Sequence, residues 1–137
     1  MSRVKDKVAL VTGGRRGLGE ASAVMLAREG AKVAITDRKE DGAEIVLNKI
    51  KSSGGEAVFI QQDVSKEEDW KNVIQQVKKQ FGRLDILVNN AGVGAGKNIE
   101  ELTLEDWRWV MSVNLDGVFL GTKYAIESMK TSGGGSI

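Results

Sequence analysis

A glycine-rich stretch, Thr12 to Gly19, has the composition of an anion-binding loop. It follows the short apolar run from Val8 to Val11 and leads into a helical pattern. A helix N-terminus offers unpaired N–H groups and a partial positive charge, and glycine lets a phosphate approach where a Cβ atom would collide. The loop therefore predicts a phosphate site, although a tight strand-to-helix turn alone would also favour glycine.

The spacing of these glycines excludes two common kinds of phosphate-binding loop. Gly13, Gly17 and Gly19 do not follow the G-x-G-x-x-G pattern of many dinucleotide-binding loops. Glu20 follows the last glycine, where a P-loop would have Lys and then Ser or Thr. The loop is therefore not a P-loop, and the glycine pattern alone does not identify its ligand.

Asp37 is the second candidate, because it ends the next apolar run at close to the roughly 20-residue spacing at which an acidic residue meets an adenosine ribose. A carboxylate there accepts hydrogen bonds from both ribose hydroxyls and repels a 2′-phosphate, which favours NAD over NADP. Arg16 or Arg38 could instead pair with that phosphate. Asp37 could also simply cap the next helix, with both arginines solvated.

The third candidate is the run Asn89-Asn90-Ala91-Gly92, which directly follows another apolar run. Two adjacent amides beside small residues suit hydrogen bonding to a cofactor and to neighbouring backbone. Turn chemistry alone also favours Asn and Gly at such a position. Finding this run together with the first two features favours the ligand interpretation.

The elements that must position these loops alternate between strand and helix. This alternation predicts a doubly wound parallel α/β sheet, the Rossmann fold, with strand order 3-2-1-4. Its ligand crevice lies beyond the carboxyl ends of strands one and four, where the glycine loop and the Asn-Asn-Ala-Gly loop both fall. The predicted strands are 8–11, 33–35, 57–60 and 86–88, and the predicted helices are about 18–29, 39–53, 65–81 and 103–130.

Two helix starts and the last helix carry further local signals. Ser65 with Glu68, and Thr103 with Asp106, resemble capping boxes. The middle of the last helix, 110–119, is apolar nearly all round, so we expect it to be buried under another protein layer or against a partner subunit. The tail 133–137 resembles a turn leading into a fifth strand, where the sheet is expected to be cut off.

The composition limits the chemistry and the partners. The 137 residues predict a single dinucleotide-binding domain over 1–137, and a net charge of +1 gives no electrostatic case for nucleic acid or membrane. The chain has no Cys and no His, so thiolate chemistry is excluded, proton transfer must use Tyr, Lys, Asp or Glu, and no metal site is expected. The charged N-terminus and the lack of a long apolar run predict a cytoplasmic protein.

Two motifs together resemble the short-chain dehydrogenase/reductase family. Its T-G-x-x-x-G-x-G pattern is met by Thr12 to Gly19, and its N-N-A-G by Asn89 to Gly92. The resemblance implies hydride transfer between a nicotinamide cofactor, NAD with NADP possible, and an alcohol or ketone. It also implies three groups of cofactor-binding residues: Gly13, Arg16, Gly17, Leu18 and Gly19 at the pyrophosphate and adjacent ribose; Asp37 at the adenosine ribose, with Asp63 and Val64 flanking adenine; and Asn90, Ala91 and Gly92 along the middle of the cofactor. Arg15 and Arg38 are expected to bind the cofactor as well.

Asn114 matches the Asn that the family carries on its fourth helix within V-N-L. The resemblance implies that this catalytic Asn helps to hold a proton-relay water by bending the helix. Without the family, Asn114 is an amide among apolar residues, which as a buried group must find partners. A satisfied core Asn or a polar contact at an interface therefore stays open.

The chain departs from the family in its catalytic residues. The family uses a Tyr, a Lys four residues later and a Ser, all after strand five. The only Tyr here is Tyr124, followed four residues later by Ser128, so Tyr124 is interpreted as a packing or interface residue.

We therefore expect an N-terminal fragment of an oxidoreductase, inactive alone, that forms homo-oligomers through the long helix when complete. A dinucleotide-binding module without catalysis, and another doubly wound nucleotide binder such as a methyltransferase, are the alternatives.

Overall fold

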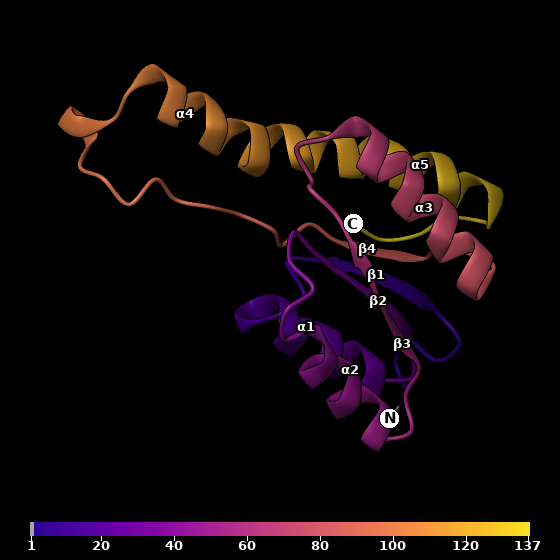
Figure 1. The fold of residues 1–137 in the computed structure, drawn as a ribbon. Helices are drawn as coiled ribbons and strands as arrows, with labels where there is room; N and C mark the ends of the chain where they lie inside the picture. The colour runs from indigo at the N-terminus through magenta and orange to yellow at the C-terminus, as the bar shows by residue number, and fades with distance from the viewer. Residues whose placement is uncertain (1) are drawn as a thin grey trace.

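Four parallel strands form the centre of the computed structural model, which describes residues 2–137 (Figure 1). Their order is β3-β2-β1-β4, as the sequence predicts. Helices α1 and α2 cover one face of the sheet, and α3, α4 and α5 lie on the other side. The strands are β1 (Val8–Thr12), β2 (Lys32–Asp37), β3 (Ala57–Gln61) and β4 (Ile86–Val88).

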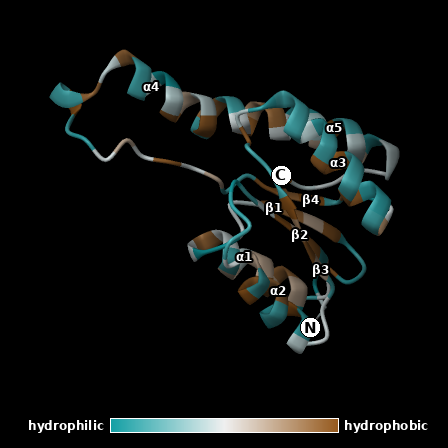
Figure 2. Cartoon of the chain, in the orientation of Figure 1, coloured by the Kyte–Doolittle hydropathy of each residue, from teal (hydrophilic) through white to brown (hydrophobic). Residues whose placement is uncertain are grey.

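The alternation of side chains along β1 builds both halves of the core. Every residue of β1 is buried, because successive side chains point to opposite faces and helices cover both faces. Val8 and Leu10 pack in the cluster beneath α3 and α5, whereas Ala9 and Val11 pack in the cluster beneath α1 and α2. The strands are accordingly the most hydrophobic part of the chain in Figure 2.

The helices fall where the apolar periodicity places them. Thr103 and Asp106 form the predicted capping box: Thr103 Oγ1 accepts from the Asp106 N–H, and Asp106 Oδ2 accepts from the Thr103 N–H, each at 3.0 Å. The helical elements are α1 (Gly17–Arg28), α2 (Ala43–Ser52), α3 (Glu67–Phe81), the 3₁₀ turn η1 (Ile99–Glu101), α4 (Leu104–Met111), the π-helical segment η2 (Ser112–Asp116) and α5 (Gly117–Thr131).

The second predicted capping box is wrong. Helix α3 begins at Glu67 with Lys66 as its N-cap and with no side-chain cap. The Ser65 hydroxyl instead donates to Asp63 Oδ1 at 2.6 Å, and the Ser65 N–H donates to the same oxygen at 3.0 Å. A carboxylate two residues upstream thus competes successfully with the helix for the serine.

The predicted helix over 103–130 is observed as α4, η2 and α5, and its apolar middle is buried on one side only. Val113 and Leu120 face the core, whereas Leu115 and Phe119 are 56% and 63% exposed. Within residues 2–137, α3 and the sheet cover only one side of this helix. Cover of its other side by a partner subunit stays a prediction. None of the described helices is both long enough and apolar enough to span a bilayer.

The tail begins to extend the sheet at the free side of β4. Ser136 pairs in parallel with Ile86, its N–H donates to the Asp85 carbonyl at 2.9 Å, and its carbonyl accepts from the Leu87 N–H at 3.0 Å. The predicted turn into a fifth strand is thus observed up to its first residues.

Candidate functional site

A cavity of about 710 Å³ opens at the carboxyl ends of the strands, where the predicted loops converge. It brings together nearly all the residues predicted to bind a cofactor. Gly19 and Asn114 are the two predicted site residues that do not line it. The predicted residues on its wall are Gly13, Arg15, Arg16, Gly17, Leu18, Asp37, Arg38, Asp63, Val64, Asn90, Ala91 and Gly92.

The glycine loop is folded tightly on itself. A Cβ atom on Gly19 would lie 2.1 Å from the Gly13 carbonyl oxygen, so only glycine fits there. Gly13 has a φ of +62°, in the left-handed region that glycine tolerates best. Gly19 therefore shapes the loop from behind, while Gly13 and Gly17 lie on the cavity wall.

The first turn of α1 has the chemistry of an anion site. Its N-cap, Arg16, makes no side-chain hydrogen bond to the helix, so no side chain caps the N–H groups of the first turn. A Cβ atom on Gly17 would meet no heavy atom within 4 Å, so this turn faces open space. Unpaired N–H groups beside an open cavity suit the oxygens of a phosphate.

Asn90 holds the glycine loop against the end of β4. Its Nδ2 donates to the carbonyls of Thr12 and Gly13 at 2.9 and 3.1 Å. The backbone N–H groups of Asn90 and Ala91 both donate to Thr12 Oγ1 at 3.0 Å. The amide N–H groups of Asn90 are thus directed at neighbouring backbone, which is one of the two uses that the sequence suggested.

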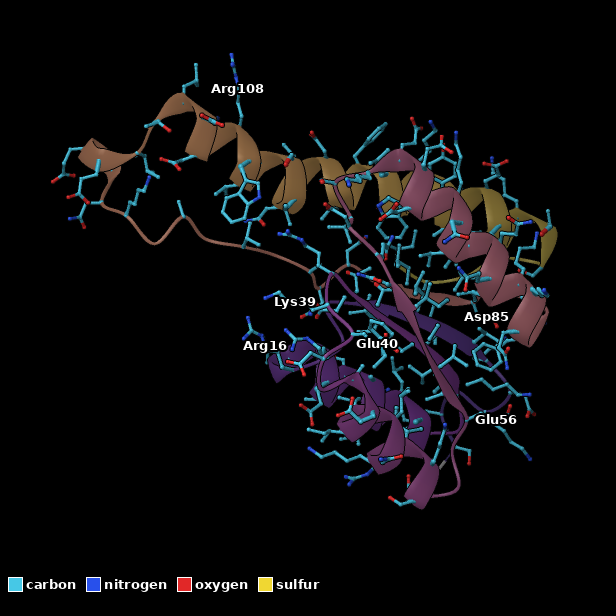
Figure 3. The ribbon with its side chains drawn as sticks, viewed as in Figure 1. Arg16, Lys39, Glu40, Glu56, Asp85 and Arg108 are labelled. Carbon is cyan, nitrogen blue, oxygen red and sulfur yellow. The ribbon has the colours of Figure 1, made fainter. Side chains whose placement is uncertain are left out.

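Asp37 lies at the end of β2 with its charge partly compensated. Its Oδ1 accepts from the Arg38 N–H at 2.8 Å, and its Oδ2 lies 3.7 Å from Arg15 Nε. Arg15 also donates to the Asp41 carbonyl at 2.7 Å. The cation beside Asp37 is therefore the Arg15 side chain, whereas Arg16 is exposed at the same end of the molecule as Lys39 (Figure 3).

Asp63 is fixed within its own loop. Its N–H donates to Asp69 Oδ2 at 2.7 Å, and its Oδ1 accepts from Ser65. Burial raises the pKa of Asp63, but the hydrogen bonds from Ser65 and the charge of Arg38 outweigh burial and leave it below the usual value. The next residue, Val64, is held by Trp70, whose indole N–H donates to the Val64 carbonyl at 2.8 Å.

Asn114 lies in the π-helical segment η2, beside the cavity and not in its wall. Its Oδ1 accepts from the Val93 N–H, and its Nδ2 donates to the Val93 carbonyl, both at 2.8 Å. The side chain is exposed, so the expectation of a buried amide is wrong. The amide is nevertheless satisfied, because it pairs with the loop that follows β4.

Tyr124 lies away from the cavity, between α3 and α5. Its hydroxyl donates to Glu67 Oε1 at 2.7 Å, and Lys123 Nζ lies 3.0 Å from the same oxygen. The hydrogen bond to Glu67 raises the pKa of Tyr124, which opposes its use as a base. This Tyr is therefore outside the site, in line with its interpretation as a packing or interface residue.

Several residues of the site were missed in the sequence. Gly14 packs so closely against β2 that a Cβ atom on it would lie 2.7 Å from Ile35 Cβ. Thr12 Oγ1 accepts the hydrogen bond from the Asn90 N–H. The position of Thr12, a hydroxyl residue at the end of β1 beside the glycine loop, could have indicated that it accepts hydrogen bonds from a neighbouring loop. The missed wall residues are Thr36, Lys39, Gln62, Val93 and Val113.

Comparison with known proteins identifies the family. The family model for short chain dehydrogenases matches residues 7–137. The chain therefore belongs to the short-chain dehydrogenase/reductase family, whose cofactor is a nicotinamide dinucleotide, NAD or NADP.

Individual relatives agree with this assignment. The chain is 50% identical to an uncharacterized oxidoreductase of Thermotoga maritima over 97% of its own length, and 46% identical to the NADP-dependent (R)-specific alcohol dehydrogenase of Lentilactobacillus kefiri over 98%. The crystal structure of a short-chain dehydrogenase/reductase from Burkholderia xenovorans superposes with a TM-score of 0.93 at 33% identity, over 98% of this chain and 56% of that one. The chain spans about half the length of the two curated relatives, 52% and 53%.

Proposed function

We propose that residues 1–137 form the dinucleotide-binding domain of an oxidoreductase that transfers hydride between NAD(P) and a small alcohol or ketone. The observation that carries this proposal is the single cavity wall on which the glycine loop, Asp37, Asp63 and the Asn90 loop meet. When bound, the nicotinamide ring supplies the hydride or accepts it. The residues of this chain bind and orient the cofactor.

The cavity fits the phosphate part of such a cofactor. In this proposal the uncapped first turn of α1, with Gly17 and Leu18, receives the pyrophosphate, and Arg16 lies beside it. Gly19 shapes that turn from behind, and Asn90, which lines the cavity, holds it through Gly13. Ala91 and Gly92 line the path toward the π-helical segment, where the nicotinamide end would lie.

The charges at the end of β2 favour NAD over NADP. The Asp37 carboxylate accepts from ribose hydroxyls and repels a 2′-phosphate. Arg15 compensates part of this charge at 3.7 Å, and Arg38 lines the cavity, so NADP binding is weakened and not abolished. The Lentilactobacillus kefiri relative is NADP-dependent, so a similar protein uses the other cofactor.

Asn114 is proposed as the catalytic residue of this chain. Its reciprocal pair with Val93 fixes the π-helical segment against the loop that leaves β4. A π-helical turn shifts the backbone hydrogen-bond pattern, which suits a helix that must hold a relay water. The exposed apolar side of η2 and α5 is proposed to form a homo-oligomer contact in the complete protein.

A dinucleotide-binding module without catalysis is the second candidate. One observation favours it: Tyr124 is bound to Glu67 outside the cavity, so the tyrosine of this chain cannot act on a substrate held there. Expression with the downstream reading frame would distinguish the two functions. Carbonyl-dependent oxidation of NADH or NADPH supports the enzyme, and cofactor binding without turnover supports the module.

Titration calorimetry with NADH, NADPH and S-adenosylmethionine tests the ligand class. We expect NADH to bind more tightly than NADPH and S-adenosylmethionine not to bind. Binding of S-adenosylmethionine alone would refute the proposal and favour a methyltransferase.

A substitution at Gly17 tests whether NADH binds at the first turn of α1. Gly17→Asp places a carboxylate beside the pyrophosphate in a backbone with a φ of +59°, so NADH affinity should fall at least about tenfold. The matched control is Gly54→Asp, which has a φ of +82° and similarly open surroundings but lies outside the cavity wall. This control should bind NADH normally.

A further inference from the structure

Thr36 and Gln62 form a buried polar pair on the wall of the cavity. Thr36 is the penultimate residue of β2, and Gln62 directly follows β3. Each is only 1% exposed, and the Thr36 hydroxyl donates to Gln62 Oε1 at 2.7 Å. The Gln62 N–H also donates to the Asp37 carbonyl at 2.9 Å. The pair therefore ties together the carboxyl ends of two adjacent strands.

The fold alone does not explain this pair. Among the described residues, Gln62 Nε2 has no hydrogen-bond partner although the atom is buried. A buried donor without a partner destabilises the folded chain, and two apolar side chains of the same shape would avoid that penalty. Polar groups that are not optimal for stability are typical of functional sites.

The position of the pair shows what it can control. Asp37 follows Thr36, Asp63 follows Gln62, and both carboxylates line the cavity. Each carboxylate is fixed in its own loop, Asp37 by the Arg38 N–H and Asp63 by Ser65. The bond between Thr36 and Gln62 adds a side-chain link to the backbone pairing of β2 with β3, immediately before the two loops, and so helps to fix their separation.

We propose that Thr36 and Gln62 are positioning residues for the adenosine half of the dinucleotide. The inference rests on the proposed function. The pair holds Asp37 at the spacing from Asp63 that lets one carboxylate meet the ribose while the other loop meets the base. Neither residue takes part in hydride transfer.

Near-isosteric variants separate this role from folding. Thr36→Val and Gln62→Leu each remove the bond, and the double variant removes both partners. Titration calorimetry with ADP-ribose should show a loss of affinity of about threefold to tenfold for each single variant, the range expected for one buried hydrogen bond. The double variant should bind no more weakly than the weaker single variant, because the two residues act as one unit. Thr36→Ser keeps the hydroxyl and should restore most of the affinity.

Thermal unfolding of the same variants gives the second readout. In the unaltered chain the Gln62 amide has a partner for its oxygen but none for its nitrogen among the described residues. The double variant should therefore have a melting temperature equal to or above that of the unaltered chain. Ser128→Ala is the matched control: it removes another buried hydroxyl, on α5 outside the cavity wall, and should leave ADP-ribose affinity unchanged.

The outcomes are distinct. Unchanged affinity in all Thr36 and Gln62 variants, additive losses in the double variant, or a loss of affinity that follows a loss of stability would each overturn the positioning role. Failure of the unaltered chain to bind ADP-ribose would instead refute the proposed function itself.

Discussion

The two ends of the same sheet use their polar groups in opposite ways. At the amino end, Asp85 is 4% exposed and fully engaged: its Oδ2 accepts from the Val8 N–H, and Arg83 Nε lies 2.9 Å from both of its oxygens. At the carboxyl end, the first turn of α1 is uncapped, and the buried Gln62 Nε2 has no partner among residues 2–137. Figure 3 shows Asp85 far from Arg16 and Lys39. One end stabilises the sheet, and the other leaves the N–H groups of the first turn of α1 available to a ligand.

The largest expected effect is on stability, at the amino end. Asp85→Asn weakens the contacts to Arg83 and Lys7 and leaves a buried amide facing the start of β1. We expect a loss of about 2–4 kcal/mol in the free energy of unfolding, measured in urea. NADH affinity of the folded fraction should be unchanged. A weaker affinity at full folding would show that the two ends are not independent.

The second-largest expected effect is on NADH binding, at the carboxyl end of the sheet. Gly19→Ala forces a methyl group against the Gly13 carbonyl and must displace the glycine loop. NADH affinity should fall more than about tenfold, equivalent to more than about 1.4 kcal/mol. Gly54→Ala is the control, because its surroundings are open and only its φ of +82° is strained. Equal affinity of the two variants would contradict the role given to the loop.

The smallest effect concerns acid pH and α4. The hydrogen bond from Lys97, with those from Thr103, lowers the pKa of Asp106 to about 2 from a model-compound value of 3.8. A carboxylate whose pKa is depressed on folding contributes stability that is complete above the unfolded pKa and is lost as pH falls through the folded pKa. Protection of the α4 amides against hydrogen exchange, relative to their intrinsic rates at each pH, should therefore fall between about pH 4 and pH 2, and Asp106→Asn should flatten this dependence. If protection does not change with pH in either the unaltered chain or the Asp106→Asn variant, the proposed stabilisation of α4 by the capping box is wrong.

The sequence predicted the strand order because its signals are local and repeat along the chain. Each apolar run is followed by turn residues, which are glycine, Asp or Asn, and the parallel connection has one favoured hand. The positions of the glycine loop and of Asp37 at the carboxyl ends of the strands were also predicted from local signals.

Pairwise contacts at the site were harder to predict, because they depend on competition between partners. Ser65 and Thr103 both begin capping-box patterns, and each has a carboxylate two residues upstream. Asp63 accepts from Ser65, whereas Glu101 accepts from the Asn98 N–H and leaves Thr103 free to cap α4. Arg15 was expected to bind the cofactor, but its place beside Asp37 could not be predicted from the loop sequence. Gln62 carries no motif at all, and only the neighbouring strand reveals its bond to Thr36.

The clamp formed by Asn90 has a thermodynamic consequence. Because its amide holds the carbonyls of Thr12 and Gly13, we expect the glycine loop to be ordered before a ligand arrives. Binding then requires little ordering of the backbone, so most of the interaction energy is available as affinity. A preorganised receptor of this kind should associate in one step, without a slow conformational phase.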